Sequence, residues 1–408
     1  MSTEITSCRI CSHRDFTTIY DLGNQVLGSR FPKQGESDPI SVPLVLIKCN
    51  NKDCELLQLK HNTSEQELYL HSYGYRSGLN NTMVEHLTNL TTEIDNKVGL
   101  KKDDIVIDIG SNDCTLLKSY KSDCIKVGID PTGTQFKGYY PENVLLIEDF
   151  FDEKLFTCTF GTRKAKVVTS ISMFYDLPDP VKFASDIKSI LAEDGIWITE
   201  QSYAVTMVDR NSFDTICHEH LEYYTLKQIK YIADQVGLKI QDISLNDCNG
   251  GSFRVTLTHA DSLIECSSFV NELYSTEAQM DLTAFVSRCE NMKEELVSLL
   301  KKKVAEGKKI YLYGASTKGN TLLQYYNLDS TLITAAAERN VEKYGCRTPG
   351  TNIPIISEAE MRRQQPDILL VLPWHFKKEF LVREQEYLNN GGCIIFPMPV
   401  LEIHQKKL

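Results

Sequence analysis

The chain has 408 residues, which is too long for one compact hydrophobic core and indicates two or three domains. Its 42% hydrophobic and 24% charged residues are typical of a globular protein, and its apolar runs are far too short to span a membrane. A formal net charge of −11 argues against a general binder of nucleic-acid phosphates, which needs a basic excess. The N-terminus lacks the basic head and apolar core of a secretory signal, so we expect a cytoplasmic protein.

Two closely spaced cysteine pairs near the start of the chain differ from the other cysteines, which are scattered. Cys8 and Cys11 form a C-x2-C pair, and Cys49 and Cys54 form a C-x4-C pair. Two such pairs on tight turns supply the four thiolates that zinc prefers in a tetrahedron. We predict a structural Zn²⁺ in a module over residues 1–70; with four protein ligands it would stabilise folding and not catalyse. Four buried or reactive thiols are the alternative.

The segment "DDIVIDIGSNDCTLLKSY" predicts a strand over Ile105–Ile109, a sharp turn at Gly110 and then a helix. A second strand, in "KVGIDPT", ends at Asp130. This order is typical of a doubly wound α/β fold, which binds its ligand at the carboxyl ends of the strands. The alternation of strands and helices continues. We expect strands over Asn143–Phe151 and from Lys166, a helix over residues 181–191, and a strand over Asp194–Ser202 after a Glu-Asp-Gly turn.

The glycine turn distinguishes two cofactors. A dinucleotide needs the spacing G-x-G-x-x-G, whereas "DIGSND" has a single glycine. S-adenosylmethionine fits better, because Gly110 would admit its amino-acid end and Asp130 could bind both ribose hydroxyls; a solvated acid at a strand end is the alternative for Asp130. The expected cofactor-binding residues are Asp108, Gly110, Asn112, Asp130, Asp149 and Phe150, the last as a platform for adenine.

The last third of the chain repeats the pattern. After residue 281 the apolar spacing predicts a long linker helix, and "KIYLYGASTKGNT" begins a second Rossmann-like fold near Lys309. The loop "GASTKGNT" lacks the lysine after the second glycine that an ATPase loop requires. We expect it to bind a diphosphate at the helix start with the help of Ser316 and Lys318, without hydrolysis. A glycine turn that only packs is the alternative.

The segment "FDTICHEHLEYY", Phe213–Tyr224, concentrates reactive side chains. A histidine, with an ordinary pKa near ~6.5, can remove a proton from a C–H group beside a carbonyl, and a neighbouring carboxylate can orient its ring. The candidate donors to the resulting enolate are Tyr223, Tyr224, Tyr75 and Asn249. In an extended strand His218 and His220 would share a face and could hold a metal; a hydrogen-bonded structural loop is the third possibility.

Taken together, these segments resemble a family of bacterial S-adenosylmethionine-dependent C-methyltransferases that act on nucleotide-linked keto-sugars. The resemblance also rests on "YGYRSGLNNTM" (Tyr73–Met83), "NGGSFRV" (Asn249–Val255) and "TPGTNIPI" (Thr348–Ile355). It implies an α/β protein with an N-terminal zinc-binding module, a central class I methyltransferase (Rossmann-like) domain and a second Rossmann-like C-terminal domain. The corresponding ranges are 1–70, 71–280 and 281–408.

The resemblance also implies roles for residues. His220 would abstract the proton with help from Glu219 and Tyr224, and the substrate would contact Tyr75, Arg76, Asn249, Ser316, Lys318 and Arg339. The sequence departs from the family at Cys217, where a tyrosine is usual, and at Asp176, where a histidine is usual. Both positions lie beside the expected substrate, so they bear on which sugar and which carbon are involved.

We therefore expect an enzyme that deprotonates a nucleotide-linked keto-sugar next to its carbonyl, so that the enolate attacks the methyl group of S-adenosylmethionine, as in deoxysugar biosynthesis. The alternatives are methyl transfer to a non-sugar or heteroatom acceptor, an NAD-dependent oxidoreductase, and a zinc-containing scaffold. The expected partner is a small molecule, with neither nucleic acid nor membrane, and the protein would be a monomer or a small homo-oligomer.

Overall fold

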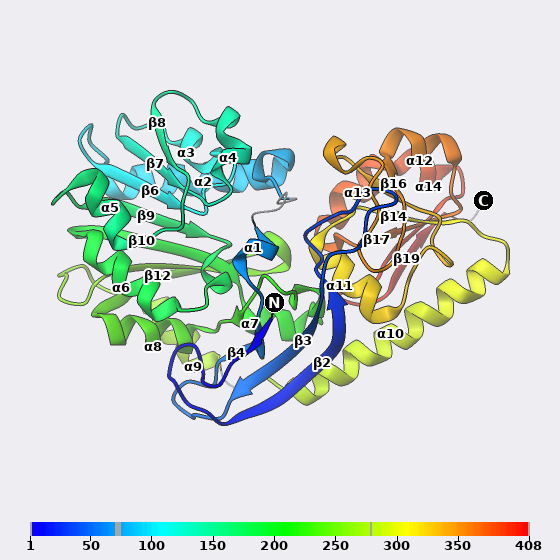
Figure 1. Ribbon diagram of the computed structural model, residues 1–408, viewed down its shortest axis with the longest axis horizontal. Coiled ribbons are helices and arrows are strands. Elements are labelled where there is room, and N and C mark those ends of the chain that lie inside the picture. The colour runs from blue at the N-terminus through cyan, green and yellow to red at the C-terminus, as the bar shows by residue number, and fades with distance from the viewer. Residues whose placement is uncertain (1, 70–74, 278–279, 407–408) are drawn as a thin grey trace.

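The computed structural model describes residues 2–69, 75–277 and 280–406. Figure 1 shows a central α/β unit beside a C-terminal α/β unit, with N-terminal strands below and between them. Helix α10 (Leu282–Ala305) runs along the C-terminal unit, as the linker-helix prediction required. The expected boundary between residues 70 and 71, and the first two residues of the motif Tyr73–Met83, lie outside the described residues.

The central unit is built on a sheet for which seven strands are described, in the order β12-β13-β10-β9-β6-β7-β8. Strands β6 to β10 are mutually parallel, whereas β13 runs antiparallel to both of its neighbours. This confirms the doubly wound α/β architecture expected for the middle of the chain. The strands are β6 (Ile105–Ile109), β7 (Ile125–Ile129), β8 (Val144–Ile147), β9 (Ala165–Ile171), β10 (Leu191–Ser202), β12 (Leu238–Asn246) and β13 (Ser252–His259).

Helices cover both faces of this sheet because its central strands are apolar on both sides. In β6, Ile105, Ile107 and Ile109 belong to one buried cluster and Val106 to another, as the alternation of side chains along a strand requires. The first cluster includes α5 (Glu153–Phe160), α6 (Pro180–Ile190) and α8 (Leu226–Val236), and the second includes α2 (Asn81–Val98) and α3 (Thr115–Ser119).

Two local expectations need correction. Strand β8 ends at Ile147 rather than at residue 151, because Asp152 caps α5 by accepting a hydrogen bond from the Leu155 amide (2.7 Å) and the intervening residues form the connection. The Glu-Asp-Gly segment, expected as a turn before a strand that starts at Asp194, is part of β10, which starts at Leu191. The pairing of β10 with β9 shifts register there, between Leu191 and Ile196.

The N-terminal module contributes to an antiparallel sheet whose described strands are, in order, β11-β4-β3-β2. Strands β2 (Phe16–Val26), β3 (Ser41–Cys49) and β4 (Leu57–Leu59) come from the module, but β11 (Glu222–Tyr223) comes from the segment with the paired histidines. A further short pair joins β1 (Thr3–Glu4) to β5 (His61–Asn62). The far end of the β2–β3 hairpin reaches the C-terminal unit, where Val26 and Gln324 exchange two hydrogen bonds (2.7 and 2.9 Å).

The C-terminal unit has a sheet for which six strands are described, in the order β16-β15-β14-β17-β18-β19, parallel except for β19. This is the second Rossmann-like fold predicted from "KIYLYGASTKGNT". The strands are β14 (Ile310–Tyr313), β15 (Ala335–Glu338), β16 (Ile355–Ser357), β17 (Ile368–Val371), β18 (Cys393–Phe396) and β19 (Glu402–Gln405). The helices are α11 (Thr317–Tyr326), α12 (Glu358–Gln364), α13 (Lys377–Arg383) and α14 (Gln385–Asn389).

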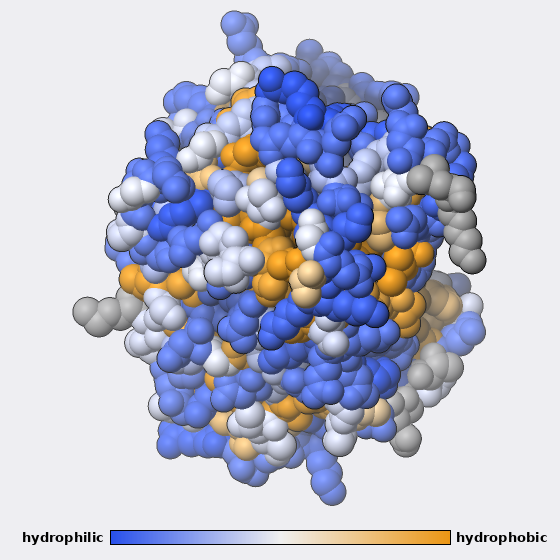
Figure 2. Space-filling model, turned by 90° about the vertical axis from the view of Figure 1, so that its right-hand side faces the viewer, coloured by the Kyte–Doolittle hydropathy of each residue, from blue (hydrophilic) through white to orange (hydrophobic). Residues whose placement is uncertain are grey.

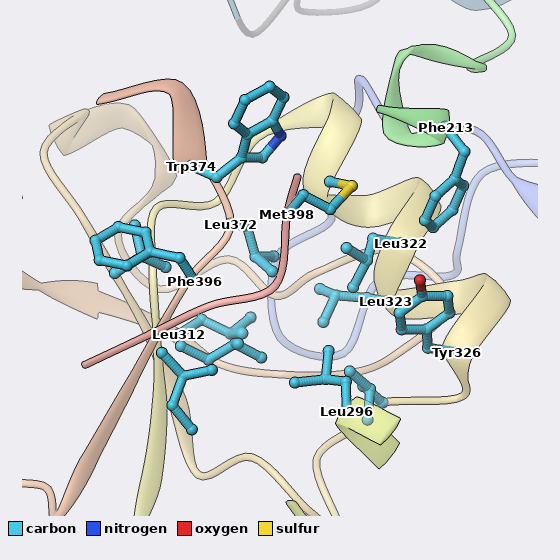
Figure 3. Close-up of a cluster of buried hydrophobic side chains, with 14 of the residues drawn as sticks. Phe213, Leu296, Leu312, Leu322, Leu323, Tyr326, Leu372, Trp374, Phe396 and Met398 are labelled. Carbon is cyan, nitrogen blue, oxygen red and sulfur yellow. The ribbon is translucent and has the colours of Figure 1, made fainter. Parts of the chain in front are cut away.

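The core of this unit includes a side chain from the central unit. Figure 3 shows Leu312, Leu322 and Leu323 packed in the interior, with Phe213 beside Tyr326. The two rings stack with centroids 5.3 Å apart. The segment Phe213–Tyr224 is therefore anchored at one end in the C-terminal core and at the other in the N-terminal sheet.

On the face of the C-terminal unit in Figure 2, hydrophilic residues cover most of the surface, with hydrophobic residues in patches among them. Across the described residues, no helix is both long enough and apolar enough to cross a membrane.

Candidate active site

The first cavity, of about 450 Å³, lies at the carboxyl ends of the central parallel strands. It is lined by five of the six predicted cofactor residues, Asp108, Gly110, Asn112, Asp130 and Phe150. Gly110 has a φ of +74°, and a Cβ there would lie 3.1 Å from the Met173 side chain, so a larger residue would close the turn. Glycine at position 110 thus allows a ligand to come close to the backbone of this turn.

The acids of this cavity are fixed in place. Asp130 accepts hydrogen bonds from the amides of Asn112 and Thr132, both at 2.7 Å. Burial raises the pKa of Asp108 to about 7. A hydrogen bond from the Thr169 hydroxyl (2.7 Å) favours the ionised form and partly opposes this rise. Asp149, the sixth predicted residue, does not line the cavity. It is exposed, and its carboxylate accepts a hydrogen bond from the Phe150 amide. The neighbouring Phe150 does line the cavity.

The second cavity, of about 340 Å³, lies between the central and C-terminal units. It is lined by every predicted substrate residue: Tyr75, Arg76, Asn249, Ser316, Lys318 and Arg339. Four residues, Tyr75, Met83, Ser172 and Asp176, line both cavities. The two cavities therefore meet at these residues, and a group bound in one can face a group bound in the other.

The segment with the paired histidines is a turn and not an extended strand. It begins with η4 (Phe213–Thr215), and the His220 amide donates to the Cys217 carbonyl at 3.1 Å. His218 contacts the Val42 carbonyl through Nε2 (3.1 Å), while His220 contacts the Thr215 carbonyl through Nδ1 (2.8 Å). Among the described residues neither ring belongs to a group of side chains placed to hold a metal, which removes support for the metal alternative.

His220 is set up as a neutral imidazole with one free nitrogen. Because a carbonyl can only accept, Nδ1 carries the proton and Nε2 retains its lone pair. The ring packs edge-on against Tyr175, with centroids 4.3 Å apart. Burial and, after it, the positive charge of Lys318 lower the pKa of His220 to about 3. The Thr215 carbonyl, and not Glu219 as the sequence suggested, orients the ring.

Glu219 instead lines the second cavity with both carboxylate oxygens buried and without hydrogen-bond partners among the described residues. Asp176 and Asp214, in the same lining, each have one such oxygen. Buried carboxylate oxygens need donors, so a ligand of this cavity has to bring hydroxyl or N–H groups.

Tyr224 does not fit the catalytic role assigned to it from the sequence. It is fully buried, stacks on Phe174 with centroids 5.4 Å apart, and lines neither cavity. Tyr223 is also buried and outside both linings. Because β11 joins the N-terminal sheet, both rings become core residues, and Tyr75 is the predicted tyrosine that reaches the junction of the cavities.

The four paired cysteines come together as predicted. The Sγ atoms of Cys8 and Cys54 lie 3.7 Å apart, those of Cys11 and Cys49 lie 3.6 Å apart, and all four atoms are within 4.8 Å of one another. A tetrahedron with Zn–S bonds of ~2.3 Å has edges of roughly 3.8 Å, close to the two measured S–S distances, so the four thiolates are placed to hold a zinc ion.

The cysteine turn also contacts the histidine segment. Arg9, between the first two cysteines, lies 3.4 Å from Glu222, and both side chains are almost fully buried. The Arg9 guanidinium donates to the Leu59 carbonyl (2.8 Å), and the Leu59 amide donates to the Leu221 carbonyl (2.8 Å). The zinc-binding turn thus supports the strand that follows His220.

Two residues of the second cavity were missed by the sequence interpretation. His375, in η7 (Trp374–Phe376), lines the cavity, and burial, with a contribution from Lys318, lowers its pKa to about 3. Its position just after strand β17 is a signal that could have pointed to it, because parallel strands place ligand contacts at their carboxyl ends. Asp214 accepts from the Trp374 indole (3.2 Å), and burial raises its pKa.

The glycine turn of the C-terminal unit is partly occupied by its own side chains. Ser316 caps α11 by accepting from the Gly319 amide (3.0 Å), and Glu338 accepts from the Ala315 amide (2.9 Å). Arg339 is paired with Glu358 at 3.2 Å. Lys318 points across the cavity to the Asn249 carbonyl (3.1 Å).

Comparison with known proteins agrees with this architecture. Three family models match in chain order: "Putative zinc binding domain" over residues 8–69, "Methyltransferase domain" over 83–243, and "C-methyltransferase C-terminal domain" over 247–399. The C-methyltransferase NovU of Streptomyces niveus is 29% identical over 409 residues, which cover 97% of this chain and 96% of NovU.

Solved structures similar to part of the chain include a methyltransferase of Geobacter sulfurreducens in complex with S-adenosylhomocysteine. It is 12% identical with a TM-score of 0.30, and covers 43% of this chain and 90% of its own. The mitomycin 7-O-methyltransferase MmcR is 12% identical with a TM-score of 0.35, and covers 45% of this chain and 55% of its own.

The protein is therefore an S-adenosylmethionine-dependent methyltransferase with a class I α/β fold. Its N-terminal cysteine cluster belongs to a zinc-binding module, and the whole-length similarity to NovU supports C-methylation as its reaction. The oxidoreductase and scaffold alternatives do not agree with these matches.

Proposed function

We propose that the protein methylates a carbon next to the carbonyl of a nucleotide-linked keto-sugar, with His220 as the base. S-adenosylmethionine, in the first cavity, supplies an electrophilic methyl group. The observation that carries the proposal is the junction of the two cavities at Ser172, Tyr75 and Asp176, with His220 in the lining of the second cavity and its Nδ1 held by the Thr215 carbonyl.

The residues of the second cavity agree with a sugar. The unpartnered carboxylate oxygens of Glu219, Asp176 and Asp214 can accept from sugar hydroxyl groups, which fixes the acceptor ring in position. A carbon acid requires an unprotonated base beside the C–H group. His220 lines the second cavity and is neutral at physiological pH, so it can take this role.

The far end of the same cavity agrees with a nucleotide diphosphate. The N-terminus of α11 opens on it, and helix N-termini favour phosphate. Arg339 and Arg383 line this end and are held by Glu358. A diphosphate there would leave the linked sugar to extend towards His220.

The experiment is mass spectrometry of products after incubation with S-adenosylmethionine and a panel of nucleotide-linked 4-keto sugars, followed by NMR to locate the methyl group. A methyl group on the carbon next to the carbonyl supports the proposal. Methylation of oxygen or nitrogen, or of free ketones in preference to every nucleotide-linked sugar, would contradict it.

A further inference from the structure

Lys318 belongs to the C-terminal unit but its ammonium lies against the central unit. Its Nζ donates to the Asn249 carbonyl at 3.1 Å, and the Asn249 amide group donates to the Ser172 hydroxyl at 3.3 Å. Ser172 lines both cavities. Two hydrogen bonds thus connect the ammonium to the place where the cofactor and the acceptor meet.

The turn that receives Lys318 is held rigidly. Asn249 has a φ of 53°, and Gly250 packs so closely on Trp374 that a Cβ would lie 3.0 Å from the indole. That indole in turn donates to Asp214 at 3.2 Å. The turn is therefore fixed between the two units, and the position of the ammonium is fixed with it.

Among the residues that the structure describes, Lys318 and Lys343 are the cations of the cavity that form no ion pair with a carboxylate, and only Lys318 reaches the turn of the central unit. Arg339 and Arg383 are paired with Glu358 at 3.2 and 3.3 Å, and Lys343 donates to the Ala315 carbonyl at 2.8 Å. After its bond to Asn249, the ammonium of Lys318 has two further N–H groups. Its charge lowers the pKa of both His220 and His375, so it is close to the imidazole base.

We propose that Lys318 is a catalytic residue that stabilises the enolate oxygen of the acceptor, and not a ligand of the diphosphate. The inference rests on the proposed function. When the C–H bond breaks, the proton passes to Nε2 of His220, the electron pair forms a C=C bond, and the carbonyl π electrons move to oxygen. Lys318 donates a hydrogen bond to that oxygen and remains protonated.

The step then completes without another reactant. The enolate carbon forms a bond to the methyl group, the electron pair of the broken S–C bond stays on sulfur, the carbonyl is restored, and His220 releases its proton to solvent. A neutral imidazole beside an ammonium is a weak base, so the deprotonation needs charge stabilisation on the acceptor oxygen. An ammonium that is already oriented provides it without reorganisation.

The test compares Lys318→Met and Lys318→Arg with Arg339→Met, using the keto-sugar that the wild-type enzyme methylates. For Lys318→Met we expect kcat to fall about 100- to 1,000-fold, as for loss of an oxyanion donor. Affinities for S-adenosylhomocysteine and for dTDP or UDP should stay within about twofold, and Lys318→Arg should recover part of kcat. Arg339→Met should weaken nucleotide affinity more than Lys318→Met does, and should lower kcat less, since it lies at the proposed diphosphate end.

A substrate-free readout accompanies the kinetics. In an NMR titration of ¹³C-labelled histidine, the pKa of His220 should rise in Lys318→Met, because one of its two lowering causes is removed. Unchanged kcat with weakened binding of the nucleotide, or an unchanged His220 titration, would overturn the role of Lys318 alone. A wild-type enzyme that methylates no keto-sugar would overturn the proposed function and this inference together.

Discussion

The contact between the zinc-binding turn and the histidine segment leads to a quantitative prediction. Arg9 and Glu222 form an ion pair whose side chains are 2% and 0% exposed. Removing one partner of such a pair leaves a buried charge without compensation, at up to about 3–5 kcal/mol. Burial raises the pKa of Glu222, so uptake of a proton by its carboxyl reduces this cost. Arg9→Met should therefore weaken the local pairing of β11 with β4. At ~1.4 kcal/mol per factor of ten, a loss of about 3 kcal/mol accelerates hydrogen exchange at these strands about 100-fold.

Hydrogen–deuterium exchange of zinc-loaded protein measures this effect directly. The reporters are peptides that contain Leu59, whose amide donates to Leu221, and peptides that cover residues 217–224. Lys230→Ala is the matched control, because its pair with Asp234 is 2.6 Å long but exposed and worth only about 0.3–0.5 kcal/mol. Exchange in Arg9→Met within about twofold of the wild type would refute the reasoning, and Arg9→Met with Glu222→Gln should recover part of the protection.

Three further predictions follow from the two sites. Gly110→Ala should weaken S-adenosylhomocysteine binding about tenfold in calorimetry. Alanine is strained at this positive φ by about 1–2 kcal/mol and its Cβ meets Met173, so the turn should shift away from the conformation that binds the ligand; unchanged affinity would contradict the placement of the cofactor. Removal of zinc by a chelator should lower the Tm and release one ion per chain, as measured by mass spectrometry of the metal; a Tm that does not depend on zinc would exclude a folding role. Burial holds the pKa of Asp108 at about 7 in the folded protein, above its ordinary 3.8, so the folded state loses stability as the pH rises from 3.8 to 7. Asp108→Asn should therefore flatten the curve of Tm against pH from about pH 5 to 7, and an unchanged slope would contradict this.

Much of the fold could be predicted because its signals are local. The strand and turn at Ile105–Gly110 follow from an apolar run that ends in a glycine with positive φ, and the same reasoning located β14. The cysteine cluster was equally accessible, because the spacing within each pair restricts the ligands to tight turns.

The side-chain arrangement of the second cavity could not be predicted in the same way. The burial of Tyr224 depends on β11 pairing with β4, more than 160 residues earlier, and the orientation of His220 depends on the Thr215 carbonyl. Lys318 meets Asn249 only because the two α/β units pack together. Sequence patterns specify which residues carry the chemistry, whereas contacts between distant segments decide which of them face the cavity.

The central claim is that His220 removes a proton from carbon beside the bound methyl donor. The most direct measurement is deuterium incorporation into a nucleotide-linked 4-keto sugar in D₂O without S-adenosylmethionine, compared between the wild type and His220→Ala. The wild type should exchange the hydrogen next to the carbonyl, whereas His220→Ala should not, although it still binds S-adenosylhomocysteine and the nucleotide. Exchange at the wild-type rate in His220→Ala would contradict the account.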